Sequence, residues 1–310
     1  MYNLIAIDLD GTLLNSNGVV SNETKETLQK IKDKDIKIVL ASGRMIDSIK
    51  SISNEIGNQK YLVAGNGAIV YDIEKQEILY KNYLKKEKVL DVIKICEENS
   101  IYYNIYTENE LLTTSLKYNV LYYHKENANR EEKDRMKISI MSNMYDYVLN
   151  SQRDDYLKIT ICDEDRMVFN SIIRKIKQIK DIDVLDVEHM SRKNIMQGTE
   201  TIELNYSYTE VSAQNVDKWE AINYILEQEN ISKEHVIAVG DNINDKKMIE
   251  NAGLGIAMVG SSPVVTEIAN IITSENNNED GVAKELRKII LDGWMLQKWH
   301  KNITEILQED

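Results

Sequence analysis

Two carboxylates one residue apart follow a short apolar run near the start of the chain. Asp8 and Asp10 come directly after residues 4–7, and Gly11 follows them. Such a run is typical of a strand buried on both faces of a parallel sheet, whose ligands bind beyond the carboxyl ends of the strands. A turn at Gly11 lets both carboxylates converge on one site. Adjacent carboxylates repel each other unless a cation compensates, and oxygen ligands favour Mg²⁺.

The alternative is that Asp8–Gly11 is only a surface turn, because Asp and Gly are common in turns. Polar residues at two other predicted strand ends favour a functional site over a surface turn. Residues 36–40 end in Ala41-Ser42-Gly43-Arg44 before a helix at about 45–56. Backbone N–H groups at a helix start attract anions, and Ser42 adds a donor, although Ser42 could simply cap the helix. Residues 236–239 break at Gly240, and Asp241 and Asp245 follow at a spacing that sets them on one side of a helix's opening turn.

The elements that must position these residues alternate between β and α at both ends of the chain. This alternation predicts an α/β fold with a doubly wound parallel sheet, with a strand returning at 201–204 and a helix opening at Asp217-Lys218. Between them lies an α+β stretch of about one hundred residues, the size of a small domain. We therefore expect a core domain of residues 1–82 and 194–310 and an inserted domain of residues 83–193.

Composition restricts the partners of the protein. The chain has 310 residues, 42% hydrophobic residues and a formal net charge of −13, which argues against nucleic-acid and anionic-membrane surfaces. We expect no signal peptide before the first strand, and no apolar run of the sequence approaches the ~20 residues of a membrane span. Cys96 and Cys162 are expected to be buried, reduced thiols of a cytoplasmic protein. For the tyrosines at 118, 122 and 123, we favour packing and rim positions over a ligand-binding role.

Several motifs together resemble those of a known family. DLDGTLL at 8–14, ASGR at 41–44, Lys218 at a helix start and GDNINDKKM at 240–248 occur in the order of the four motifs of haloacid-dehalogenase-like (HAD) phosphatases. GNGA at 65–68, GLGIAM at 253–258 and the long insert resemble the Cof-type branch. The resemblance implies a Rossmann-like core, an α/β cap domain over the site, and Mg²⁺-dependent hydrolysis of a phosphate ester.

The resemblance also implies roles for individual residues. Asp8 would be the nucleophile that forms an aspartyl phosphate, and Asp10 the general acid and then the base. The implied metal ligands are Asp8, the main-chain carbonyl of Asp10 and Asp241, with Asp245 in support. Ser42 and Lys218 would hold the phosphoryl oxygens, with Asn244 as a helper. Gly43, Arg44 and Asn66 are further candidate substrate contacts. Trp219 stands where the family has a glycine after the lysine, and Lys193 is the nearest upstream alternative to Lys218.

The expected function is hydrolysis of a small phosphorylated metabolite, such as a sugar phosphate, FMN or pyridoxal phosphate, by a monomer or homodimer. Two alternatives use the same fold: a phosphotransferase or sugar-phosphate mutase, and a non-catalytic ligand-binding protein. Residues 190–197 are expected to line the substrate pocket, with Arg44 and Asn66 at its floor. The tail with Trp294 and Trp299 is expected to pack on the core.

Overall fold

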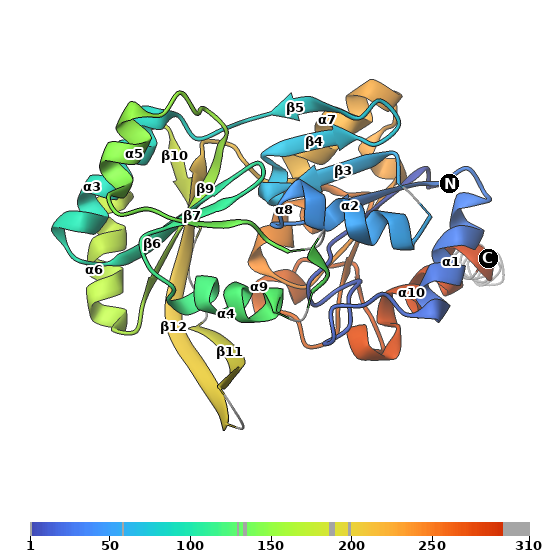
Figure 1. Ribbon diagram of the computed structural model, residues 1–310. Helices are drawn as coiled ribbons and strands as arrows, with labels where there is room; N and C mark the ends of the chain where they lie inside the picture. The colour runs from blue at the N-terminus through green and yellow to red at the C-terminus, as the bar shows by residue number, and fades with distance from the viewer. Residues whose placement is uncertain are drawn as a thin grey trace.

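The chain builds two β-sheets that lie side by side (Figure 1). The computed structural model describes residues 2–57, 59–128, 130–132, 135–185, 190–197 and 200–293, and at 190–197, 200 and 201 it describes the backbone. The expected packing of the tail at Trp294 and Trp299 lies outside the described residues. In the described part, no helix is long and apolar enough to cross a membrane.

The first sheet contains eight described strands in the order β15-β14-β13-β1-β2-β3-β4-β5. All neighbours from β15 to β3 are parallel, whereas β3, β4 and β5 pair antiparallel. The strands are β1 (Leu4–Ile7), β2 (Lys37–Ala41), β3 (Tyr61–Ala64), β4 (Ile69–Asp72), β5 (Glu77–Lys81), β13 (Val236–Gly240), β14 (Leu254–Ala257) and β15 (Ile271–Ile272).

Helices cover both faces of this sheet. Successive strand residues point to opposite faces, so the apolar residues of one strand contribute to two buried clusters. Ile5 and Ile7 of β1 belong to one buried cluster, and Leu4 and Ala6 to another. The first cluster includes residues of α1 (Asn22–Lys32), α2 (Ile46–Glu55) and α10 (Gly281–Leu286). The second includes residues of α7 (Lys218–Glu229), α8 (Lys246–Asn251) and α9 (Pro263–Thr266). The expected doubly wound α/β core is confirmed.

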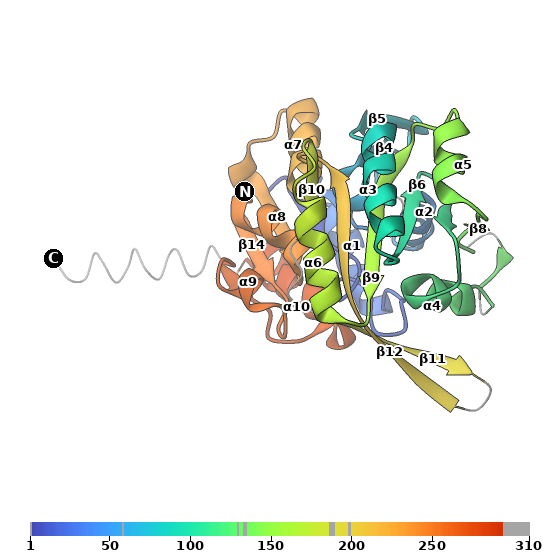
Figure 2. The same ribbon diagram turned by 90° about the vertical axis from the view of Figure 1, so that its left-hand side faces the viewer.

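The second sheet has the order β10-β12-β9-β6-β7-β8, with β11 paired to β12. Its strands are β6 (Tyr102–Thr107), β7 (Leu111–Thr113), β8 (Ile138–Ile140), β9 (Tyr156–Asp163), β10 (Ile182–Val184), β11 (Met190–Gln197) and β12 (Glu200–Ala213). Helices α3 (Lys86–Glu98), α5 (Met144–Asn150) and α6 (Arg166–Ile176) lie on the side away from the first sheet, and α4 (Tyr118–Asn127) lies at one end (Figures 1 and 2). We call this second unit the cap. The face of its sheet opposite α3, α5 and α6 therefore points toward the first sheet.

The strand expected at 201–204 exists but belongs to the other sheet. It is part of β12, which pairs antiparallel with β9, β10 and β11. Residues 201–204 alternate between apolar and polar. This pattern indicates a strand but does not tell which of the two sheets the strand joins. The expected boundary at 193/194 thus falls inside β11, and we propose instead that the cap ends after β12, near Gln214.

Both cysteines match the expectation. Cys96 on α3 and Cys162 on β9 are buried, and they form no disulfide with each other. Cys96 lies in the apolar cluster beneath the cap helices, and burial raises the pKa of its thiol.

Candidate active site

Asp8 and Asp10 leave the end of β1 in different environments. Asp8 continues the strand, since its N–H donates to the carbonyl of Val239 at 3.0 Å, and its side chain is buried. The chain then turns at Gly11, where φ is +85° and an added Cβ would lie 2.5 Å from Oδ2 of Asp241. Asp10 is exposed on this turn. Both carboxylates line one cavity, as expected, but only Asp8 belongs to its buried part.

Asp241 and Asp245 follow β13 and hold different partners. Oδ2 of Asp245 accepts from the backbone N–H groups of Asp241 and Asn242, at 2.9 and 3.0 Å. Oδ1 of Asp241 accepts from the Thr12 hydroxyl at 3.1 Å. Asp245 thus fixes the loop that carries Asp241. The sequence predicted both residues on one side of a helix's opening turn, but only Asp245 lies in the turn Ile243–Asp245, and Asp241 precedes it.

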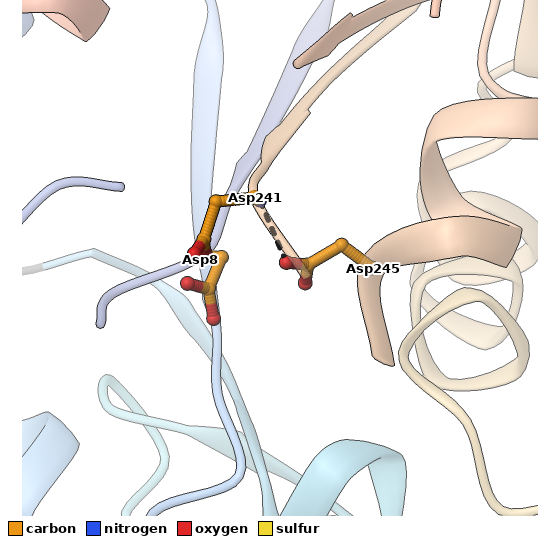
Figure 3. Close-up of side chains that lie close together, drawn as sticks. All are labelled: Asp8, Asp241 and Asp245. Carbon is orange, nitrogen blue, oxygen red and sulfur yellow. Dashed lines mark hydrogen bonds between the residues drawn. The ribbon is translucent and has the colours of Figure 1, made fainter. Parts of the chain in front are cut away.

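Asp8, Asp241 and Asp245 meet at the carboxyl ends of neighbouring strands (Figure 3). One carboxylate oxygen from each lies within 4.8 Å of the others. Such a cluster of hard oxygen ligands fits Mg²⁺, which protein sites usually bind through one or two carboxylates, waters and substrate phosphates. The side chain of Asp10 is not part of this cluster.

Lys218 is the cation of the cluster. Asp217 caps the helix α7, so Lys218 stands at its first position. The side chain is buried, and its Nζ donates to Oδ1 of Asp8 at 2.5 Å and to Oδ1 of Asp245 at 2.6 Å. The structure therefore brings Lys218 into the site despite Trp219 after it. Lys193, the alternative, lies on β11, and its side chain is outside the described part of the chain.

The electrostatics of the cluster favour an added cation. Burial and the charge of Asp245 raise the pKa of Asp8 well above its ordinary value. The same two causes raise the pKa of Asp241 to about 7. Burial alone would lower the pKa of Lys218, but Asp245 and Asp8 raise it. The cluster holds three carboxylates and one ammonium, which bonds to Asp8 and Asp245, and a divalent cation would neutralise the excess negative charge.

Ser42, Gly43 and Arg44 follow β2 at the wall of the same cavity. The Ser42 hydroxyl accepts from the backbone N–H of Arg44 at 3.2 Å. The Arg44 guanidinium holds Asp10 with two bonds, from Nε at 2.8 Å and from Nη2 at 2.6 Å. The proposed proton carrier is therefore positioned at the cavity mouth by the arginine of the ASGR motif.

Asn66 and Asn244 complete the floor. Asn66 adopts a left-handed conformation, with φ 59° and ψ 27°, in the turn after β3. Its Oδ1 accepts from Nδ2 of Asn244 at 3.0 Å, and its backbone N–H donates to the Ser42 carbonyl at 2.9 Å. Arg44 and Asn66 both line this cavity, and their place at the floor of a substrate pocket stays a prediction. Leu185 also lines the cavity; for residues 190–197, whose side chains are outside the described structure, the expectation stays a prediction.

Side chains of the cap also line this cavity. The sequence pointed to only two of them, Tyr122 and Tyr123, and favoured packing and rim roles for them over a binding role. The volume is about 340 Å³, at the lower end of the range for small-molecule sites. The described cap residues in its wall are Tyr106, Tyr122, Tyr123, Arg130, Met136, Lys158, Leu185, Tyr208 and Glu210. A lysine within the otherwise apolar start of β9, and the same-face series Tyr206, Tyr208, Glu210 on β12, were the available signals.

Comparison with known proteins agrees with this site. The family model of haloacid dehalogenase-like hydrolases matches residues 5–286. Phosphatase YwpJ of Bacillus subtilis is 27% identical over 93% of this chain and 99% of its own. The 5-amino-6-(5-phospho-D-ribitylamino)uracil phosphatase YcsE of the same organism is also 27% identical, over 93% and 96%. A haloacid dehalogenase-like hydrolase structure from Bacteroides thetaiotaomicron, 28% identical, covers 94% of this chain and 100% of its own with a TM-score of 0.73. The chain therefore belongs to the haloacid dehalogenase-like hydrolase family and is a phosphatase of that family.

Proposed function

We propose that the protein is a Mg²⁺-dependent phosphatase of small phosphorylated metabolites that works through an aspartyl phosphate on Asp8. The observation that carries the proposal is the buried meeting of Asp8, Asp241 and Asp245 with the ammonium of Lys218. A carboxylate attacks a phosphate dianion poorly unless the negative charge is neutralised first. Asp8 and Asp241, with Asp245 in support, would hold Mg²⁺, which supplies that neutralisation when bound.

In this proposal, the chain's own residues position the ester and move the proton. Lys218, Ser42 and the backbone after Ser42 hold the phosphoryl oxygens. A carboxylate oxygen of Asp8 forms a bond to phosphorus as the bond from phosphorus to the leaving oxygen breaks. Asp10 gives its proton to that leaving oxygen, then takes one from the water that attacks the aspartyl phosphate and releases Asp8. A carboxyl group has about four acceptor positions, so Asp10 can carry this proton while Arg44 holds both of its oxygens.

The substrate class rests on the cavity and on the relatives. A volume of about 340 Å³ suits a small metabolite. One relative is named for a phosphate ester of a ribitylamino-substituted uracil. We therefore propose sugar phosphates and related esters, including FMN and pyridoxal phosphate, as the panel to test first.

The test measures release of inorganic phosphate from p-nitrophenyl phosphate and from this panel. Turnover should require Mg²⁺ and fall below detection in Asp8→Asn. Mg²⁺ should also raise the melting temperature of the wild type, and raise it less in Asp241→Asn, because one oxygen ligand loses its charge. A phosphorylated product without phosphate release would indicate a transferase, and tight binding without turnover a non-catalytic protein.

A further inference from the structure

A buried ion pair of the cap lies against the floor of the cavity. Nζ of Lys158 donates to Oε1 of Glu210 at 2.6 Å, and the two side chains are 7% and 18% exposed. Lys158 and Glu210 are diagonal neighbours on paired strands, since Glu210 is opposite Thr160 in the register of β9 and β12. Both line the cavity that contains Asp8.

Glu210 is joined to the phosphate end of the cavity. Its Oε2 accepts from Nδ2 of Asn66 at 2.7 Å, and Asn66 is bonded to the backbone of Ser42. An added Cβ at Gly43 would lie 2.7 Å from Oδ1 of Asn66, so the asparagine is packed against the Ser42–Gly43 turn. The carboxylate of Glu210 thus stands where the leaving group of an ester held at Ser42 would begin.

Glu210 is the one carboxylate that the described cap residues contribute to this wall, and it neutralises Lys158. The other cap cation of the lining, Arg130, lines a second cavity as well, which shares Asp10 and Arg44 with the first. An ammonium has three donors and a carboxylate about four acceptor positions, so the pair retains capacity for hydroxyl groups. A leaving group with its own anionic group would meet the charge of Glu210 without a free counter-charge on Lys158.

We propose that the Lys158–Glu210 pair selects the charge of the leaving group, and that the substrate is a monophosphate ester of a neutral, hydroxylated alcohol. This inference rests on the proposed phosphatase function and narrows its substrate class. Neutralising Glu210 frees the charge of Lys158 for an anionic leaving group. Removing the charge of Lys158 leaves Glu210 to repel such a group. The two changes should therefore shift the preference for an anionic leaving group in opposite directions.

The experiment compares two acyclic six-carbon esters that differ at one end. Sorbitol 6-phosphate ends in an alcohol and 6-phosphogluconate in a carboxylate. The measured quantity is the ratio of kcat/KM for 6-phosphogluconate to that for sorbitol 6-phosphate, with saturating Mg²⁺. Glu210→Gln should raise this ratio about tenfold, and Lys158→Met should lower it about tenfold, as expected for a unit charge a few ångströms away in a partly screened site.

Glu110→Gln is the matched control. Glu110 is also a cap glutamate in ion pairs, with Arg153 and Lys137, and it lines neither cavity. Its ratio should stay within twofold of the wild type. A ratio that stays within twofold in both folded test variants, or that moves in the same direction in both, would overturn the inference.

Failure of the proposed function has a different signature. If the wild type releases no phosphate from any ester, the phosphatase mechanism is wrong, but selectivity can still be measured by binding. Calorimetry of both esters on Asp8→Asn, and on Asp8→Asn combined with Glu210→Gln, gives the ratio of dissociation constants. The same tenfold change would support the charge selectivity without turnover, and an unchanged ratio would contradict it.

Discussion

At the scale of single residues, Lys218 is the side chain on which the acidic cluster depends. It is fully buried, and its ammonium is shared by Asp8 and Asp245. Removing one partner of a buried ion pair leaves uncompensated charge, which is far more destabilising than removing an exposed pair.

Lys218→Met should therefore lower the free energy of unfolding by about 3 kcal/mol in metal-free buffer. It should lower kcat on the order of 10²- to 10³-fold, the usual effect of removing one donor to a developing anion. Urea denaturation and phosphate release measure the two effects. The control is Lys247→Met. The Lys247 side chain is 57% exposed and pairs with Asp217, so its loss should change stability by less than about 1 kcal/mol. Equal effects of the two variants would contradict the assigned role.

At the scale of elements, the turn after β3 supports the start of α7. Gly67 has φ +106°, and an added Cβ would lie 2.0 Å from the carbonyl oxygen of Asp217. That carbonyl belongs to the N-cap of the helix that begins with Lys218. The contact is between backbones, so neither side can yield without moving the helix start.

Gly67→Ala should destabilise the protein by about 2–4 kcal/mol, combining the left-handed conformation with overpacking. It should also lower kcat, because the displaced helix carries Lys218. Gly260→Ala is matched to it: φ is +84° there, but the added Cβ meets nothing within 4 Å. This control should lose only about 1 kcal/mol and keep its activity. Thermal unfolding and turnover of p-nitrophenyl phosphate distinguish the two; equal losses would refute the steric argument.

The other end of α7 is held by charge. Burial opposes ionisation of Glu229, but hydrogen bonds from Lys60 and Tyr61 and the charge of Lys37 lower its pKa to about 2. Because this pKa is lower in the folded state than the ordinary 4.5, ionised Glu229 stabilises the protein above about pH 4.5, and the stabilisation disappears as pH falls towards 2.

Glu229→Gln should thus cost about 1 kcal/mol at pH 7, the value for a partly exposed ion pair, and less at pH 3. Urea denaturation at both pH values measures the difference from the wild type. Glu227→Gln, on the same turn but exposed, should change stability by less than about 0.5 kcal/mol. A difference for Glu229→Gln that does not shrink at low pH would exclude this linkage.

The sequence predicted correctly those elements whose place in the sheet follows from local signals. A buried strand followed by Asp or Ser and Gly marks a carboxyl end, and such ends of neighbouring parallel strands meet, so Asp8, Ser42 and Asp241 could be brought together in advance. Strand 201–204 could not be assigned, because sheet membership depends on non-local pairing. Lys158 and Glu210 could not be linked to the site, because their role depends on how the cap faces the core.

At the scale of the whole molecule, we propose that the cap is an insertion whose ends meet. Nδ2 of Asn82 donates to the carbonyl of Gln214 at 3.0 Å. The cluster of Asp8, Asp241, Asp245 and Lys218 comes entirely from the segments outside the cap. The cap still packs on the core, since Tyr106, Leu111, Val120 and Leu157 join the core cluster. Removing the cap should therefore keep the catalytic chemistry, abolish the substrate selectivity and lower the stability of the protein.

Replacing residues 83–213 with a short Gly-Ser linker should give a less stable protein that still unfolds cooperatively, because apolar core surface becomes exposed while the parallel sheet remains intact. Mg²⁺ should still raise its melting temperature, and p-nitrophenyl phosphate should still be hydrolysed, more slowly, because water enters freely. The preference between sorbitol 6-phosphate and 6-phosphogluconate should disappear, since Lys158 and Glu210 are gone. A folded capless protein that keeps this preference would place selectivity in the core, and one that no longer responds to Mg²⁺ would show that the cap is needed to form the acidic cluster.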